Sequence, residues 1–364
     1  MRRFTKALVT GVVTGLAATA LAGAGASPAG ADTSGGAGGG GAYAEASIRV
    51  TVTGGTGKSY STTKSVPATC WWEPFELGEG YGFPPVDPND PASVEAYFQA
   101  IAPFLSGHAA GGRLELPEGD YVKDIIRRVA AGEKLTFYEA TCVDGKNAVQ
   151  EGLIPKSGTW QGVDFGVRFR AFPPGDPPGP VVPAEVLADL AREELTFANP
   201  EIDYNPKLSG PLATLVGLPT WFWVTNQAAA LGNGPDGIGS ARAVATAGGG
   251  GDPFSEATVE ATNGGMTVQA DGLVESPKDC TLAQVRTAYG PGVAEGSACT
   301  ATFERASVGT ANGFGVTVTT KFKVSWHGTE ANGTDVGPFD IDLAADPATV
   351  LNVPVAESQA VVNG

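Results

Sequence analysis

Apolar and polar residues alternate in short runs over most of the second half of the chain, and glycines separate the runs. Alternation with a period of two is typical of strands with one buried face, and turns roughly 8–12 residues apart are typical of β-sandwiches. The pattern therefore predicts a C-terminal β-sandwich. Its expected strands are 218–224, 241–247, 255–262, 266–270, 298–305, 314–327, 339–343 and 351–362.

The first half of the chain mixes strand and helix patterns. Alternating residues on either side of a Gly-rich turn predict a hairpin close to the start, and apolar residues at helical spacing predict two helices in this half and a third just after it. We therefore expect a mainly β protein with a mixed α+β N-terminal domain. The expected strands are 46–52, 59–68, 135–142 and 163–172, and the expected helices are 93–105, 121–131 and 184–195.

Composition divides the chain into segments. Residues 173–183 are so rich in proline that they predict an extended linker, because proline removes backbone donors and fixes φ. Residues 32–43, half of which are glycine, predict a flexible leader. The expected order is a signal peptide (1–31), the leader (32–43), the α+β domain (44–172), the linker (173–183), a helix with an extended connector (184–212) and the sandwich (213–364).

Two tryptophans stand out in the expected strand 218–224. Trp221 and Trp223 are two residues apart, so both side chains lie on one face of the strand. We expect these rings to fill the core between the two sheets, near Cys280 and Cys299. The alternative is a surface platform for a ligand.

The N-terminus has the layout of a signal peptide. Arg2, Arg3 and Lys6 precede an uncharged run of small and apolar residues, which ends at Ala29-Gly30-Ala31. This small-x-small site predicts cleavage before Asp32 and a secreted protein. An uncleaved anchor is the alternative, but a spanning helix needs about 20 strongly apolar residues. We expect no stable membrane span after cleavage.

The charge of the chain excludes one class of binding partner. The formal net charge is −16, and loss of the three basic residues in the signal peptide makes the mature chain still more acidic. Such a surface does not hold nucleic acid by non-specific attraction. We therefore expect no nucleic acid as a partner.

Four cysteines are present, an even number that is typical of disulfides in exported proteins. Three pairings are possible. We favour Cys70 with Cys142 and Cys280 with Cys299, because each pair then falls within one half of the chain.

Several motifs resemble catalytic or binding signatures. Residues 52–59 end like a phosphate-binding loop, but Val52 replaces the first glycine and a strand pattern follows. Ser61 and Lys64 match the serine–lysine spacing of penicillin-binding enzymes, yet they lie in the same strand pattern. His108 and His327 are the only histidines, too few for a zinc site or a serine triad. We predict no catalytic residue, metal, nucleotide or other cofactor.

Acidic residues offer a further possibility. Asp340 and Asp342 share one face of an expected strand, and Asp87, Asn89 and Asp90 cluster in one loop. Paired carboxylates can catalyse glycoside hydrolysis. Solvated turn residues explain both groups better.

Sequence strings between Asn199 and the C-terminus carry a resemblance to a known group. They are Asn199-Pro-x-Ile-x-x-Asn-Pro, Leu218-Pro-Thr-Trp-Phe-Trp-Val, Gly-Gly-Met-Thr-Val-Gln-Ala, Cys299-Thr-Ala-Thr-Phe, Phe322-Lys-Val-Ser-Trp and Pro354-Val-Ala-Glu-Ser-Gln-Ala-Val-Val. This layout resembles a group of secreted actinobacterial proteins of unknown function. The resemblance implies a C-terminal PKD-like, immunoglobulin-like β-sandwich and implies no activity.

Two functional classes follow. The leading hypothesis is a non-enzymatic extracellular binding or envelope-associated protein, with Trp71, Trp72 and Phe75 as candidate contacts to a glycan or protein. The alternative is a carboxylate-based hydrolase that acts on a glycan or cell-wall polymer. Two carboxylates about 5–10 Å apart in a cleft would distinguish the hydrolase.

Overall fold

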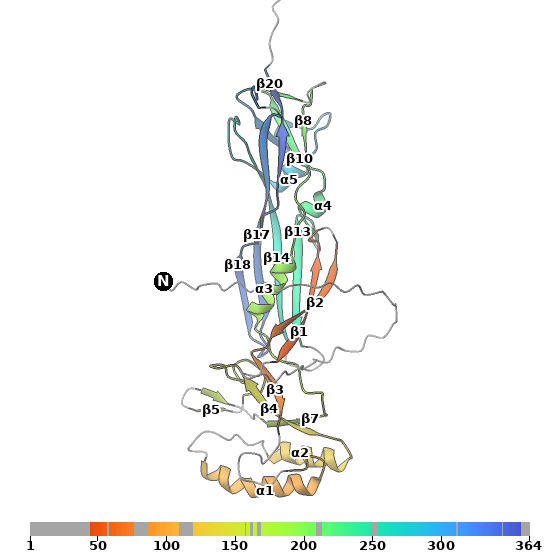
Figure 1. Ribbon diagram of the computed structural model, residues 1–364, viewed down its shortest axis with the longest axis vertical. Coiled ribbons are helices and arrows are strands. Elements are labelled where there is room, and N and C mark those ends of the chain that lie inside the picture. The colour runs from red at the N-terminus through yellow and green to blue at the C-terminus, as the bar shows by residue number, and fades with distance from the viewer. Residues whose placement is uncertain are drawn as a thin grey trace, which may run out of the picture.

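The protein is an elongated body of three stacked units, which we call the base, the middle unit and the distal unit (Figure 1). The expected signal peptide and leader lie outside the described residues. None of the described helices is long and apolar enough to cross a membrane. The computed structural model describes residues 44–56, 58–75, 86–108, 119–156, 158–160, 163–165, 169–208, 213–248, 254–310, 312–343 and 345–357.

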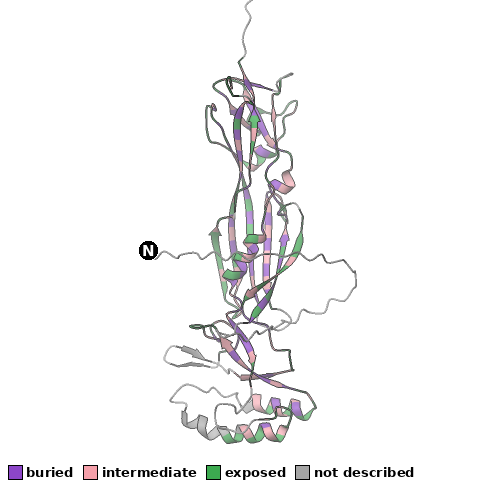
Figure 2. Ribbon diagram, in the orientation of Figure 1, coloured by how far each residue is buried: buried purple, intermediate pink, exposed green. Residues whose placement is uncertain are grey.

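The middle unit is an antiparallel sheet with one helix on one face (Figure 1). Buried and more accessible residues alternate along β1 and β13, so each of these two strands has one core face (Figure 2). Helix α3 packs on a stripe of alanines in β13, because small side chains let a helix approach a sheet closely. The sheet order is β18 (Asp335–Ile341), β17 (Phe314–Thr329), β14 (Ser255–Gln269), β13 (Ser240–Ala247), β1 (Glu45–Thr53) and β2 (Tyr60–Pro67), and α3 is Ala184–Glu194.

Strands β14 and β17 run through both the middle and the distal units. Val259 and Val324 lie in the core beneath α3, whereas Met266 and Val318, on the same two strands, lie in the distal core. At about 3.3 Å per residue, β14 spans about 50 Å. The two upper units therefore share a continuous backbone ladder.

The distal unit is a β-sandwich. One sheet continues β14 and β17, with β15 and β19 at its edges, and the other has the order β16-β10-β8. Phe222, Phe303 and Met266 are fully buried in the core of this unit. Its further strands are β8 (Ile202–Asn205), β10 (Pro219–Val224), β15 (Lys278–Cys280), β16 (Cys299–Thr302) and β19 (Ala348–Val353).

Short elements complete the distal unit. Helix α5 has a capping box, in which Thr281 and Gln284 satisfy each other's backbone N–H groups. The remaining elements are β9 (Thr214–Leu215), α4 (Gln227–Ala230), β11 (Asn233–Gly234), β12 (Gly237–Ile238), α5 (Leu282–Arg286), the 3₁₀ helix η1 (Glu295–Ser297) and β20 (Val355–Ala356).

The base is a small sheet, β3-β4-β7, accompanied by two helices. Ile125 of α2 and Leu135 are buried together with Phe137 of β4, so the helix and the sheet share a core. The elements are β3 (Cys70–Pro74), α1 (Pro91–His108), α2 (Gly119–Ala130), β4 (Thr136–Cys142), β5 (Gly158–Trp160), β6 (Val163–Phe165) and β7 (Phe169–Phe172).

Both expected disulfides are confirmed. Cys70–Cys142 joins the paired strands β3 and β4 of the base. Cys280–Cys299 joins β15 to β16 and so links the two sheets of the distal sandwich.

The expected grouping of residues 44–172 is wrong for the first hairpin. Strand β1 pairs with β13 across nearly 200 residues, so β1 and β2 extend the sheet of the middle unit and do not belong to the base. The prediction failed because strand alternation identifies a buried face but does not identify the partner strand.

The proline-rich segment 173–183 is a packed connector and not a free linker. The backbone N–H of Val181 donates to the carbonyl oxygen of Cys70, and the N–H of Thr69 donates to the carbonyl oxygen of Val181. Val182 is fully buried in the core of the middle unit. These contacts fix the base to the middle unit at the place where segment 173–183 passes from one to the other.

Candidate functional site

Strand β10 of the distal unit presents aromatic side chains on both faces. Phe222 and Val224 point into the sandwich core and are fully buried. Trp221 and Trp223 share the opposite face, as strand alternation predicts, but this face points away from the inter-sheet core. Our expectation that the two tryptophans fill that core is therefore wrong.

The choice of inward face follows from the neighbouring strands. Phe222 stands opposite Tyr204 of β8 and Cys299 of β16, and both of these residues pack in the core. The sequence of β10 offers apolar side chains to either face, so it does not determine which face is inside.

Trp221, Trp223 and Tyr289 form what we call the distal aromatic residues. Trp221 is 7% exposed because the ring of Tyr289 stands edge-on against it, at 5.2 Å between centroids and 88° between planes. Tyr289 itself is 53% exposed, and Trp223 is half-buried. An edge-to-face pair of this kind is a favourable aromatic geometry.

Polar side chains occupy the neighbouring positions on this face. Asp203 stands opposite Trp223, and Asn205 and Thr300 flank Trp221 from the two adjacent strands. All three are half-buried and thus accessible in part. The face combines apolar rings with amide, hydroxyl and carboxylate groups.

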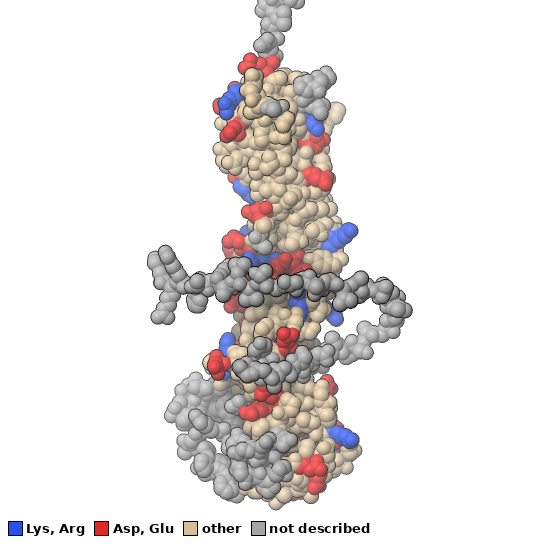
Figure 3. Space-filling view, in the orientation of Figure 1, with Lys and Arg blue, Asp and Glu red and all other residues tan. Residues whose placement is uncertain are grey.

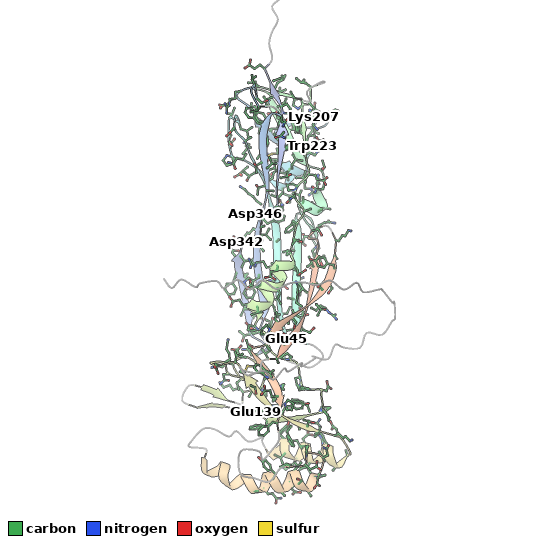
Figure 4. The ribbon with its side chains drawn as sticks, viewed as in Figure 1. Glu45, Glu139, Lys207, Trp223, Asp342 and Asp346 are labelled. Atoms are coloured by element: carbon green, nitrogen blue, oxygen red, sulfur yellow. A yellow bond between two sulfur atoms is a disulfide. The ribbon has the colours of Figure 1, made fainter. Side chains whose placement is uncertain are left out.

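The carboxylate of Asp203 is already engaged. It forms an ion pair with Lys207 and accepts the backbone N–H of Tyr204. The Lys207 ammonium also lies 4.7 Å from the centroid of the Tyr204 ring. Burial raises the pKa of the Tyr204 phenol, and Lys207 opposes that shift in part. Figure 4 shows Lys207 and Trp223 together in the distal unit.

This geometry suits binding better than hydrolysis. On this face, the described paired residues of β8, β10 and β16 include one carboxylate, that of Asp203. Glycoside hydrolysis ordinarily uses two. Asp342, one of the paired carboxylates considered from the sequence, lies nearer the middle unit (Figure 4). The described residues contain no group of three or more His, Cys, Asp or Glu that could hold a metal ion.

The aromatic residues that we expected to contact a ligand lie in the base and its junction with the middle unit. Trp71 and Trp72 are 5% and 4% exposed, and Trp71 donates its indole N–H to Glu73. Trp72 packs edge-on against Phe172, and Phe75 packs against Phe169. These contacts build cores and leave the two tryptophans little free surface.

The resemblance to a phosphate-binding loop has a structural explanation. The turn after β1 leads into strand β2, whereas a phosphate cradle leads into a helix. Gly54 has a φ of 82°, and a Cβ there would stand 2.3 Å from the backbone nitrogen of Gly234. Glycine is needed for this close approach to the β11–β12 turn.

The two side chains of the serine–lysine motif do not form one site. Ser61 and Lys64 are three residues apart on β2, so their side chains lie on opposite faces of the strand. The Ser61 hydroxyl donates to the carbonyl oxygen of Val50, and Lys64 forms an ion pair with Glu194.

The acidic loop before α1 serves the backbone. Asp87 accepts the N–H of Asn89, and Asp90 accepts the N–H of Ala92 at the start of the helix. Asn89 accepts the N–H of Leu135. This is the turn and capping role that the residue types favour.

Tyr289 was missed by the sequence analysis. It lies in a Gly/Pro-rich loop after α5, where an aromatic residue has no periodic pattern to reveal it. A large ring in a loop of small residues is the available signal.

Comparisons with known proteins identify no relative of this chain. No protein-family model matches the chain. No curated protein and no solved structure matches it either.

Proposed function

We propose that the chain is a secreted, non-enzymatic binding or envelope-associated protein that contacts a glycan through the distal aromatic residues. The observation that carries the proposal is aromatic surface on the outer face of the sandwich, where Trp223 is half-buried and Tyr289 stands exposed over the buried Trp221. The outer face of a sandwich is ordinarily polar, so exposed aromatic surface there indicates a contact.

A glycan fits the chemistry of this face. Sugar rings have an apolar C–H face that can stack on Trp223 or Tyr289, and their hydroxyl groups can bond to Asn205 and Thr300. Three adjacent strands, β16, β10 and β8, carry these groups, and a chain of sugars can lie across them. A protein partner is the other possibility, and the binding experiment separates the two.

Export is supported by two features. The N-terminal segment has the layout of a signal peptide. The two disulfides fit an oxidising compartment. Sequencing of the released protein should show an N-terminus at or near Asp32, and release of a product that begins at Met1 would contradict cleavage.

The shape of the body also supports a binding role. The distal aromatic residues belong to the unit farthest from the base (Figure 1). An elongated body of this form can hold a binding face away from whatever the base contacts. We further propose that the distal sandwich is of the immunoglobulin or PKD-like type, which its inter-sheet disulfide supports.

A carboxylate-based hydrolase is less well supported. The single carboxylate in register on the aromatic face, Asp203, pairs with Lys207. A hydrolase would need a second acid held across the substrate.

A pull-down with insoluble polysaccharides and purified cell walls tests the proposal. The mature protein should be retained, and Trp223→Ala and Tyr289→Ala should each reduce retention by about tenfold or more without loss of folding. Phe339→Ala is the matched control, because Phe339 is 51% exposed and lies on β18 of the middle unit.

Each outcome decides a different part of the proposal. Equal retention of the wild type and both aromatic variants would contradict the assigned face. Failure to bind any polysaccharide or cell wall would contradict the glycan, and capture of a protein by the same face would assign the other partner class. Release of shortened glycan chains would favour the hydrolase.

A further inference from the structure

Strand β19 lies at the edge of the distal sheet and pairs only with β17 among the described residues. The backbone N–H of Thr320 donates to the carbonyl oxygen of Pro347, which marks these residues as a hydrogen-bonded pair. Hydrogen-bonded pairs recur at every second residue of an antiparallel ladder. The N–H and C=O groups of Ala348, Val350 and Asn352 therefore point away from β17, towards the open edge.

This edge carries no charge. Residues 347–356 contain no acidic or basic side chain, although the chain as a whole has a net charge of −16. Val350 is 67% exposed, and the β17 residues beside β19 on this face are Gly315, Thr317 and Thr319. The visible face of the distal unit has wide areas without charged residues (Figure 3).

The other long edges carry features that hinder strand pairing. Strand β18 has Asp335 and Asp340 and a register shift against β17, and β2 has Lys64 tied to Glu194. Charges and bulges are the usual means by which proteins block their sheet edges. Among the described edge strands longer than four residues, β19 alone has no charged residue.

We propose that a second copy of this chain pairs with β19 in antiparallel fashion, about a two-fold axis through Val350. In this register Val350 pairs with Val350 of the other copy, and Ala348 pairs with Asn352 in both directions. All three open positions are then used, which gives about six backbone hydrogen bonds. Registers centred on a neighbouring residue leave at least one open position unpaired.

Charge supports a second copy as the occupant. The symmetric register sets uncharged segments against each other, so no like charges meet across the strand pair. An interface of the same patch with itself is the usual form of a two-fold dimer. The two distal sheets would join into one continuous sheet across the dimer.

The dimer should be weak and sensitive to salt. A single strand pair buries less than the roughly 1,200 Å² of a standard stable interface, so we expect a Kd on the order of micromolar. Added salt should tighten the dimer, because it screens the repulsion between two acidic chains.

The pairing has a consequence for ligand binding. The distal aromatic residues lie on β10 and its neighbouring loop, and β10 belongs to the other sheet of the sandwich. A dimer through β19 leaves both aromatic faces available. Two faces on one particle bind a polymer more tightly than one.

Sedimentation of the mature protein over a concentration series tests the proposal. We expect a monomer–dimer equilibrium in the wild type and at least about tenfold weaker association in Val350→Lys and Val350→Pro. Proline at this position removes an N–H that β17 does not use. Val350→Thr keeps a β-branched side chain and an open backbone and should dimerise, as should Val308→Lys, which places the same charge on an 88% exposed loop residue.

Oxidative cross-linking of a cysteine variant tests the register independently of the lysine and proline variants. Opposed Cα atoms in a hydrogen-bonded pair are about 5.5 Å apart, within the range that a disulfide spans. Val350→Cys should give a covalent dimer on a non-reducing gel, and Val308→Cys should not.

Three results would overturn the proposal. They are a wild type that stays monomeric at about 100 µM, an association that Val350→Lys leaves unchanged, or a Val350→Cys protein that cross-links no faster than Val308→Cys. Capture of a strand from a different protein on a monomeric chain would likewise show that a second copy is not the occupant.

Discussion

A Cβ atom on Gly265 would stand 1.9 Å from the carbonyl oxygen of Cys280. Gly265 lies at the register shift in β14, where this strand passes between the two upper units, and its φ of 113° favours glycine. Cys280 belongs to β15 and carries the inter-sheet disulfide. The irregularity in the long strand and the bridge between the sheets are therefore in direct contact.

Gly265→Ala should destabilise the protein by more than about 3 kcal/mol, because it adds a backbone clash to an unfavourable φ. Gly264→Ala is the matched control, since its nearest neighbour, the carbonyl oxygen of Lys321, would be 3.9 Å away. The control should stay within about 0.5 kcal/mol of the wild type in urea unfolding. Similar losses in both variants would contradict the packing described here.

Phe222→Ala and Trp223→Ala should separate the two faces of β10. Phe222 is fully buried in the distal core, so its truncation should cost about 3–5 kcal/mol. Trp223 is half-buried on the outer face, and its truncation should cost less than about half as much. Denaturant midpoints measure both values, and a larger loss in Trp223→Ala would reverse the assignment of faces.

Loss of each disulfide should have a different cost. The Cys280–Cys299 bridge closes a separation of 19 residues, and the Cys70–Cys142 bridge closes one of 72. In the loop-entropy description, these bridges contribute about 3 and about 4 kcal/mol. Paired Cys→Ala variants, compared by urea unfolding, test the order. A base bridge that contributes less than the distal bridge would count against the entropic account.

Acid should weaken the contact between Asp279 and Lys321. The hydrogen bond from Lys321, helped by one from Thr267, lowers the pKa of the Asp279 carboxyl. A carboxyl with a lowered pKa stabilises the fold above its unfolded pKa of about 4 and loses that contribution as pH falls through the folded value. Asp279→Asn should therefore be less stable than the wild type at pH 7.

The difference between Asp279→Asn and the wild type should shrink in acid. Once the pH is below the folded pKa of Asp279, both side chains are uncharged in either state, so the two unfolding curves should approach each other in acid. A gap of the same size at both pH values would assign the effect to a cause other than charge.

The sequence predicts individual strands better than it predicts their partners. Alternation located the first hairpin, but nothing in residues 46–52 indicates that they pair with 240–247. Residues 255–262 and 266–270 were expected to be two strands, yet they form one, because a register shift between Asn263 and Gly265 lets the ladder continue. Glycines that suggest a turn can equally mark a bulge.

The candidate site was predictable only in part. The sequence placed Trp221 and Trp223 on one face but did not show that Phe222 would face the core. Trp71 and Trp72 were candidate ligand contacts because they are adjacent aromatics. Both rings are buried, because their short strand contacts a core on each side. Tyr289 comes to the site through the path of a loop, which no local pattern encodes.

The shared strands β14 and β17 also determine how the body responds to tension. Where the middle unit meets the distal unit, the covalent main chain of both strands carries a force applied along the long axis. The middle and distal units cannot be drawn apart unless one strand slides past its neighbour and breaks many ladder bonds together. The separation between the distal and middle units should therefore stay constant under flow, which a flexible linker between them would not ensure.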